Sequence, residues 1–160
     1  MSGLHTKLKE RFPEAVAEVH AQHGDETAIV PRLSLIEIAH FLKSDPDFDM
    51  NVLMDLTAVD GLEMGWKPRF EVVYHFLSFR KNHRLRLKVR LDEKDPVVPT
   101  LTGLWPIANW FEREAWDMFG IRFDGHPDLR RILMYEPFEG HPLRKDYPYN
   151  KRQPLIGPKN

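Results

Sequence analysis

Cysteine is absent from the 160 residues of this chain. Its absence excludes a disulfide framework, a catalytic thiol and an iron–sulfur cluster, since cluster irons need cysteine ligands. No stretch approaches the roughly 18 apolar residues that cross a bilayer, and the polar residues 1–10 lack the apolar run of a secretory signal. We therefore expect a soluble intracellular protein without a direct membrane span, either free or docked onto a membrane complex.

An excess of positive charge is absent as well. The 23 Lys and Arg against 24 Asp and Glu leave a formal net charge of −1, which argues against a protein that coats nucleic acid. Neither glycine-rich phosphate loop, GxGxxG or GxxxxGK[ST], occurs, so we expect no bound nucleotide or flavin. His126 and His141, with Asp128 and Asp146, lack the spacing of metal ligands. The sequence thus predicts no catalytic residue, no bound cofactor and no metal site on this chain.

Hydrophobic periodicity predicts an α+β fold, with residues 1–119 forming one domain. Its mainly antiparallel sheet is expected to be covered by helices on one face. The clearest signal lies at 84–91, where Leu and Val alternate with Arg and Lys, whereas 70–79 is apolar on both faces, as in a central strand. The expected elements are a helix 4–22 divided at Pro13, a strand 27–30, a helix that Ser34 opens as part of a capping box with Glu37 and that ends at Asp45, strands 52–59, 70–79 and 84–91, and a helix 101–119.

Residues 120–160 are predicted to form an extended, proline-rich arm. The segment has six prolines and no clear periodicity, and it is too long for an ordinary loop. It nevertheless carries more large apolar side chains than a disordered tail does. Because ordering its backbone costs about 1–2 kcal/mol per residue, we expect its apolar residues to be buried against another surface, that of partner subunits, rather than against its own domain.

The face of helix 101–119 opposite its apolar stripe carries a second candidate surface. Helical spacing gathers there Trp105, Asn109, Glu112, Arg113 and Trp116. Tryptophan and arginine dominate binding hot spots, which favours a contact with a partner. The alternative is that the arm folds over this face and buries the tryptophans. Both interpretations remain open.

The acidic residues of the same helix suggest acid–base chemistry, but their spacing does not support it. Glu112 and Glu114 point to different sides of a helix, so they cannot share a substrate. Arg113 and Asp117 are four residues apart and can form an ion pair. Structural ion pairing is therefore the expected role.

Two Gly-His-Pro turns repeat within the arm, at 125–127 and 140–142. Each is predicted to set a rigid turn whose imidazole hydrogen-bonds a backbone group or a carboxylate. The basic residues that follow the turns suit carboxylates on a neighbouring chain; they are Arg130, Arg131, Arg144 and Lys145.

The basic face of strand 84–91 offers a different function, an RNA-binding α+β module. RNA-binding sheets usually carry aromatic side chains on which bases stack, whereas here Leu and Val alternate with the charges. A solvated or interfacial sheet face is the expected role, and RNA binding remains an alternative.

One family resemblance covers residues 27–150. Residues 112–121 (EREAWDMFGI), followed by His126 and 130–133 (RRIL), closely resemble the signature of the 30 kDa subunit family of respiratory complex I, the C subunit of the proton-pumping NADH:quinone oxidoreductase. Residues 140–148 (GHPLRKDYP) look like the C-terminal motif of that family, and 55–60 (DLTAVD) and 105–110 (WPIANW) are similar to two further segments. Trp116 departs from the Tyr expected in many relatives, which concerns one interface detail.

The resemblance implies a structural subunit of the peripheral arm of the complex. It implies contact with the large subunit that resembles hydrogenase large subunits and proximity to the subunit carrying the terminal cluster, on the cytoplasmic side of the membrane. NADH, FMN, iron–sulfur clusters and quinone are then expected in neighbouring subunits only. The related subunit of a membrane-bound hydrogenase or ferredoxin-dependent complex is an alternative. The residues expected to contact partners are Trp105, Asn109, Glu112, Arg113, Trp116, Asp117, His126, Arg130, Arg131, His141, Arg144, Lys145, Asp146 and Tyr147.

Overall fold

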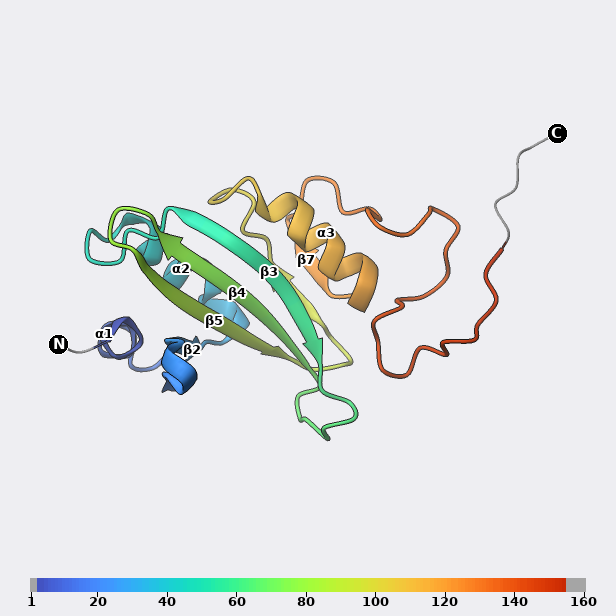
Figure 1. The fold of residues 1–160 in the computed structure, drawn as a ribbon, viewed down its shortest axis with the longest axis horizontal. Coiled ribbons are helices and arrows are strands. Elements are labelled where there is room, and N and C mark those ends of the chain that lie inside the picture. The colour runs from blue at the N-terminus through green and yellow to red at the C-terminus, as the bar shows by residue number, and fades with distance from the viewer. Residues whose placement is uncertain (1–2, 155–160) are drawn as a thin grey trace.

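The computed structural model describes residues 3–154 and shows an α+β domain followed by a long irregular segment (Figure 1). The helices and strands, in chain order, are α1 (Leu4–Arg11), β1 (Glu18–His20), β2 (Thr27–Ile29), α2 (Leu35–Ser44), β3 (Val52–Asp60), β4 (Phe70–Ser78), β5 (His83–Leu91), β6 (Val97–Pro99), α3 (Ala108–Phe119) and β7 (Arg122–Asp124). Short 3-10 turns lie at Gln22–Gly24 and Arg32–Ser34.

The main sheet has five strands in the order β1-β2-β5-β4-β3. All neighbours are antiparallel except β2 and β5, which run parallel. The predicted strand 70–79 is confirmed as an interior strand, since β4 lies between β3 and β5 and is buried along nearly its whole length. A separate parallel pair joins β6 to β7. The predicted mainly antiparallel sheet is thus confirmed.

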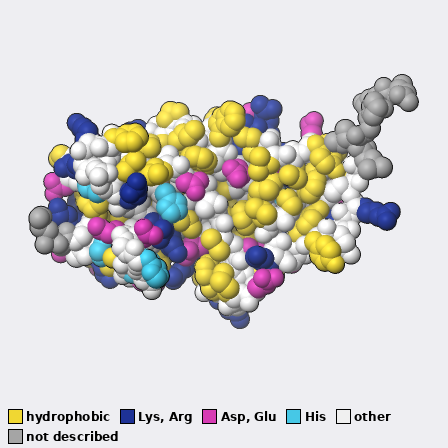
Figure 2. Space-filling view, in the orientation of Figure 1, with side chains coloured by type: hydrophobic (Ala, Val, Ile, Leu, Met, Phe, Trp, Pro, Cys, Tyr) yellow, Lys and Arg dark blue, Asp and Glu magenta, His cyan; other side chains and the backbone are white. Residues whose placement is uncertain are grey.

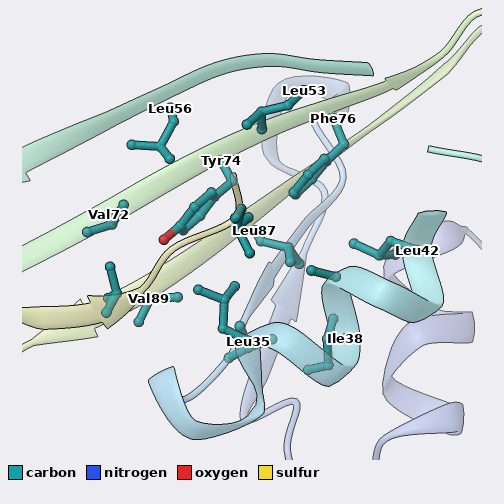
Figure 3. Close-up of a cluster of buried hydrophobic side chains, with 14 of the residues drawn as sticks. Leu35, Ile38, Leu42, Leu53, Leu56, Val72, Tyr74, Phe76, Leu87 and Val89 are labelled. Atoms are coloured by element: carbon teal, nitrogen blue, oxygen red, sulfur yellow. The ribbon is translucent and has the colours of Figure 1, made fainter. Parts of the chain in front are cut away.

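The hydrophobic core lies between one face of this sheet and the helices (Figure 3). Alternate residues of β4 and β5 point into it, because successive side chains of a strand face opposite sides. Tyr74, Phe76 and Leu87 meet Ile38 and Leu42 of α2 there. The opposite face of the sheet carries the charged residues of β5, so helices on one face are confirmed.

The predicted helix 4–22 is wrong beyond residue 11. The helix ends at Arg11, just before Pro13, and β1 follows at Glu18–His20. Pro13 has no N–H to donate and its ring clashes with the preceding turn. Val19 pairs with Ala28 of β2 across an antiparallel ladder, so pairing with the sheet outweighs the helical spacing of the apolar residues.

Two predicted helix starts also need correction. Ser34 belongs to a 3-10 turn and makes no side-chain capping hydrogen bond, so α2 begins without the predicted capping box. The predicted helix 101–119 begins only at Ala108. Residues 101–107 form turns in which the Leu101 carbonyl accepts the N–H groups of Leu104 and Trp105. The predicted end at Gly120 is confirmed, because Gly120 adopts a left-handed φ of 75°.

The predicted arm is neither wholly irregular nor separate from the domain. Residues 122–124 form β7, and Leu129 and Met134 pack against the hydrophobic core. Figure 1 shows the chain from β7 onward running back along α3 before it turns away. The expectation that the apolar residues of the arm are buried only against another protein is therefore corrected for Leu129 and Met134, which pack against their own domain. Residues 155–160 of the predicted arm lie outside the described residues.

Candidate partner interface

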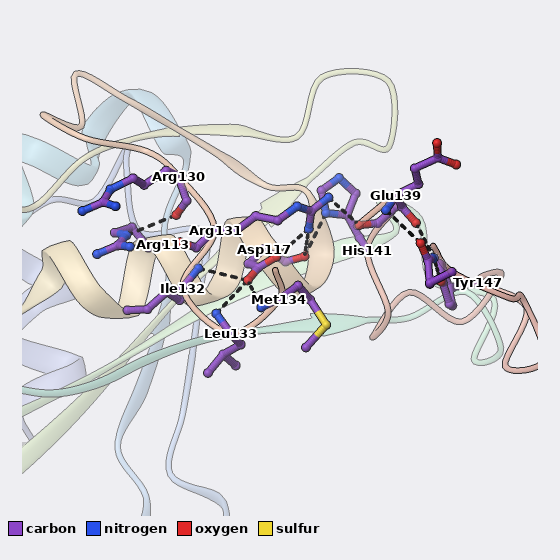
Figure 4. Close-up of polar contacts among 12 residues, drawn as sticks. Arg113, Asp117, Arg130, Arg131, Ile132, Leu133, Met134, Glu139, His141 and Tyr147 are labelled. Carbon is purple, nitrogen blue, oxygen red and sulfur yellow. Dashed lines mark hydrogen bonds and ion pairs between the residues drawn. The ribbon is translucent and has the colours of Figure 1, made fainter. Parts of the chain in front are cut away.

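Asp117 binds the arm to α3 through three successive backbone groups (Figure 4). Its Oδ2 accepts the N–H groups of Ile132, Leu133 and Met134 at 3.1, 2.9 and 2.8 Å. Its Oδ1 accepts Arg131 Nη1 at 2.5 Å. Burial by itself raises the pKa of Asp117, but these hydrogen bonds outweigh it and hold that pKa below its usual value. The carboxylate therefore fixes the arm at residues 131–134.

The arm also covers the C-terminal end of α3. The last carbonyl groups of a helix have no partner within the helix, and here the arm supplies the donors. His141 Nδ1 donates to the Asp117 carbonyl at 3.0 Å, the Leu143 N–H to Met118 at 3.1 Å, and Arg144 Nε to Phe119 at 2.6 Å. The positively charged guanidinium of Arg144 also interacts favourably with the negative end of the helix dipole.

A buried ion pair of the sheet holds the far end of the arm. Asp60, which ends β3, accepts Arg69 Nη2 at 2.6 Å, and the backbone N–H of Lys145 donates to Asp60 at 2.9 Å. Arg69 also contacts Asp146 at 2.8 Å. Burial acts to raise the pKa of Asp60, but the hydrogen bonds from Arg69, Lys145 and Leu62 prevail and lower it to about 2. This cluster joins β3, the chain before β4 and the arm.

Both predicted Gly-His-Pro turns use their imidazoles as expected. His126 Nε2 donates to the Asn109 carbonyl at 3.1 Å, and its Nδ1 accepts the Asp128 N–H at 3.0 Å. His141 binds the end of α3, and its ring lies edge-on to Trp116 at 6.2 Å. Each imidazole thus fastens one turn of the arm to α3.

Besides the buried Asp117, two further predicted interface residues lie in the interior. Trp105 is 3% exposed and Glu112 is fully buried, so the prediction that they share an exposed helix face is wrong. Trp105 precedes the helix, and its ring packs on Phe76 at 4.9 Å between centroids. Glu112 turns toward the Leu101 backbone, whose N–H it accepts at 2.7 Å.

The predicted ion pair of Arg113 with Asp117 does not form. Asp117 pairs with Arg131 instead, and Arg113 donates to the carbonyls of Arg130 and Arg131 at 3.1 and 3.0 Å. Arg130 forms an exposed ion pair with Asp128. Arg131 and Arg144, which were expected to suit carboxylates of a neighbouring chain, bind acceptors of this chain.

The other predicted interface residues keep some exposure. Asn109, Trp116 and Tyr147 are half-buried, and Lys145 and Asp146 are exposed. Tyr147 stacks on Phe138 at 6.1 Å and its hydroxyl accepts Gln153 Nε2. These side chains lie beside the contacts that fasten the arm.

Large apolar side chains remain exposed along α3 and the arm. Trp110 is 63% exposed, and Leu133, Leu143 and Ile107 are each about half exposed. Figure 2 shows that hydrophobic side chains gather on the half of the drawn face that holds α3 and the arm. We name Ile107, Trp110, Leu133 and Leu143 the outer apolar residues. The arm therefore takes its order from its own domain while leaving apolar surface uncovered, as interaction sites do.

The basic face of β5 is largely neutralised by neighbouring carboxylates. Arg86 contacts Asp25 at 2.8 Å, and Lys88 contacts Glu71 at 2.7 Å. Arg90 lies 3.3 Å from Glu18. Paired cations have less charge to offer phosphates, so the sheet face does not favour the RNA-binding alternative.

Sequence reasoning missed the roles of Asp60, Arg69 and Trp110. Asp60 closes segment 55–60 and Trp110 closes segment 105–110, and both segments carry the family resemblance. The partner of Asp60 comes from the chain before β4 and from the arm, so no local spacing indicated the cluster. Ile107 fits the apolar stripe of the predicted helix 101–119, but it precedes the observed helix and is exposed.

Two features are absent from residues 3–154. Within this range no helix has both the length and the apolar character to cross a membrane. The same residues contain no group of three or more His, Cys, Asp and Glu side chains arranged to hold a metal ion.

Comparison with known proteins identifies relatives of similar length. Residues 28–153 match the family described as the 30 kDa subunit of respiratory-chain NADH dehydrogenase. The NADH-quinone oxidoreductase C subunit of Roseiflexus sp. (strain RS-1) is 51% identical over 142 residues, covering 89% of this chain and 80% of that protein. The corresponding C 2 subunit of Rhizobium meliloti (strain 1021) is 48% identical over 147 residues, covering 92% and 79%.

Two solved structures share the fold. A trypsin-resistant fragment (1-134) of Nqo5 superposes with a TM-score of 0.66 at 33% identity, covering 79% of this chain and 98% of the fragment. A chain of the membrane-bound sulfane sulfur reductase, an archaeal respiratory membrane complex, gives a TM-score of 0.71 at 24% identity, covering 91% of this chain and 84% of that one. The second likeness concerns the fold alone.

Proposed function

The chain belongs to the family of the 30 kDa subunit of respiratory-chain NADH dehydrogenase, and on that premise we propose that it is a non-catalytic structural subunit of a proton-translocating NADH:quinone oxidoreductase. In this role it holds in place the quinone-proximal subunits of the peripheral part of the complex. The docking surface is formed by α3 and by the arm of this chain. The outer apolar residues carry this proposal, because they stay exposed on a segment that is otherwise fixed by hydrogen bonds and ion pairs.

The energetics of such docking follow from the kind of side chains exposed. Trp110 presents a large ring that is 63% exposed, and a tryptophan buried at the centre of an interface contributes about 2 kcal/mol or more to binding. The backbone of the arm is already fastened to α3 by Asp117, His126 and Arg113. A prearranged surface avoids the entropy cost of ordering a loop on binding, which suits a permanent subunit contact.

The partners and location follow the family. We propose that the surface meets the hydrogenase-like large subunit and the subunit with the terminal cluster, on the cytoplasmic side of the membrane. NADH, FMN, clusters and quinone are then held by neighbouring subunits, which accords with a sequence that has no cysteine for a cluster and no phosphate loop. Relatives near 50% identity are named as C subunits of NADH-quinone oxidoreductase, which favours this complex over a hydrogenase or ferredoxin-dependent one.

The docking proposal is tested by placing a charge on the surface. In Trp110→Glu and Leu133→Glu the new carboxylate would be buried at the interface, so each variant should recover much less of the other subunits when an affinity-tagged chain is purified from native membranes. Both side chains are exposed, so the melting temperature of the free chain should stay unchanged.

Phe79→Glu is the matched control. Phe79 is 70% exposed just beyond β4, at the end of the sheet remote from the arm (Figure 1). This variant should assemble as the wild type does. Full assembly of both surface variants would refute the docking surface. A purified chain that oxidises NADH or shows flavin absorbance would refute the non-catalytic role.

A further inference from the structure

A buried polar cluster lies on the inner side of α3, away from the exposed outer apolar residues. The side chains of Glu112 and His126 are both fully enclosed, and Glu112 Oε2 lies 4.0 Å from His126 Nε2. Glu112 Oε1 accepts the Leu101 N–H at 2.7 Å, and Oε2 lies 2.5 Å from Thr100 Oγ1. Buried carboxyl groups are costly unless they are paired or neutral, so the protonation of Glu112 needs an explanation.

Hydroxyl groups around Glu112 can accommodate the carboxyl with or without its proton. Thr100 Oγ1 accepts the Thr102 N–H at 3.1 Å and lies 3.0 Å from Thr102 Oγ1. If Glu112 is ionised, the Thr100 hydroxyl donates to it and the Thr102 hydroxyl donates to Thr100. If Glu112 is protonated, it donates to Thr100, whose hydroxyl then turns to Thr102. Both arrangements satisfy Glu112 and Thr100 without moving a heavy atom.

No cation compensates an ionised Glu112 among the groups that face it in the described part of the chain. His126, from the turn after β7, already uses both ring nitrogens in the neutral form, donating from Nε2 to the Asn109 carbonyl and accepting the Asp128 N–H at Nδ1. Protonation of Nδ1 would break the bond to Asp128. Tyr74, from β4, is the other titratable group that acts on Glu112, and its buried hydroxyl has no hydrogen-bond partner. Burial raises the pKa of the Glu112 carboxyl to about 7.

We propose that Glu112 is a proton-binding site within this subunit, whose ionisation reverses the direction of the hydroxyl hydrogen bonds that link it to Thr100 and Thr102. In the neutral form the cluster carries no charge and His126 keeps its bond to Asp128. Loss of the proton leaves a buried negative charge that accepts the Leu101 N–H and the Thr100 hydroxyl, so the Thr102 hydroxyl then donates to Thr100. This inference concerns the interior of the chain and does not depend on the proposed partners.

The test follows carboxyl and amide signals of the full chain against pH. With glutamate labelled at the carboxyl carbon, one signal of the wild type should titrate near pH 7 rather than 4.5. That signal should be missing in Glu112→Gln and present in Glu114→Gln, whose side chain is exposed on the same helix. The amide signal of Leu101, whose N–H donates to the Glu112 carboxyl, should shift with the same midpoint in the wild type.

Two results would overturn the proposal. The first is a wild-type chain in which every glutamate carboxyl titrates near its ordinary value, and the second is a Leu101 amide that stays unmoved while Glu112 titrates. Both are measured on the wild type, so failure of Glu112→Gln to fold leaves the test intact. Thr100→Val then supplies the second variant, because removal of the hydroxyl takes away the donor to the ionised form and should move the titration to higher pH.

Discussion

Replacing Asp117 by asparagine should release the arm from α3 without unfolding the domain. Asparagine has nearly the same shape, but it carries no charge and places an NH2 group where one carboxylate oxygen accepted hydrogen bonds. The Asp117 side chain contacts residues 131–134 of the arm. Loss of the carboxylate charge should therefore destabilise the arm before the rest of the domain.

The magnitude follows from the hydrogen bonds that lose their charge. Three N–H groups converge on Oδ2, and hydrogen bonds to a charged group contribute about 1.5–3 kcal/mol against about 1 for neutral pairs. Weakening of the three costs about 2–3 kcal/mol. Arg131, whose side chain is 15% exposed, loses its counter-ion, which adds about 1 kcal/mol because its remaining contact with water and with the Gly140 carbonyl limits the loss. The expected total is about 3–4 kcal/mol.

Amide hydrogen exchange measures this loss locally. A change of about 3–4 kcal/mol corresponds to exchange of the Ile132, Leu133 and Met134 amides that is faster by about 100-fold to 1,000-fold. The control is Asp128→Asn, because Asp128 pairs with Arg130 at the surface, where side chains are 55% and 71% exposed. Exposed pairs contribute less than about 1 kcal/mol. If the three amides of Asp117→Asn exchange as slowly as in the control, Asp117 does not hold the arm and the reasoning fails.

Three further changes test the remaining contacts. Arg69→Met leaves Asp60 buried without its ion pair and should lower the free energy of unfolding, measured by urea titration, by about 3–5 kcal/mol. A decrease of less than about 1 kcal/mol would show that the buried ion pair does not stabilise the fold. The pKa of Asp60, lowered to about 2 from 3.8, gives stability that is present above about pH 4 and falls by about 2 kcal/mol as the pH drops to 2, whereas Asp60→Asn should lack this acid dependence. Gly120→Ala places a methyl group 2.6 Å from His141 Cδ2 at a left-handed φ and should speed exchange of the Leu143 amide; unchanged exchange would show that the turn tolerates it.

The secondary structure was predictable where one local signal dominated. Strand 84–91 alternates apolar and charged residues, and the structure has β5 at His83–Leu91 with its apolar residues in the core. Helix α2 likewise follows its apolar stripe. The N-terminal region failed because Val16 and Val19 fit a helix locally but pack and pair better beside β2. The spacing of apolar residues along the chain carries no information about the stability gained by packing and pairing with a distant strand.

The candidate interface was predictable in its segments and less so in its residues. The 112–121 and 140–148 segments do lie together, and both histidine turns bind α3 as expected. Trp105 was misplaced because the helix begins after Pro106 rather than at 101, which changes the direction of every earlier side chain. Arg113 was paired with Asp117 because only helical neighbours were visible, whereas Arg131 competes for that carboxylate from 14 residues away.

The class of the fold, the absence of cysteine ligands and the family could all be inferred without coordinates, because periodicity, composition and long motifs are properties of the linear chain. Which surface stays exposed depends on how the arm packs against the domain. The arm lies on α3 because Asp117, the final carbonyl groups of the helix and the Asp60–Arg69 pair all need partners that only a distant segment supplies. Burial of these polar groups selects one fold of the arm, and the outer apolar residues are what that fold leaves uncovered.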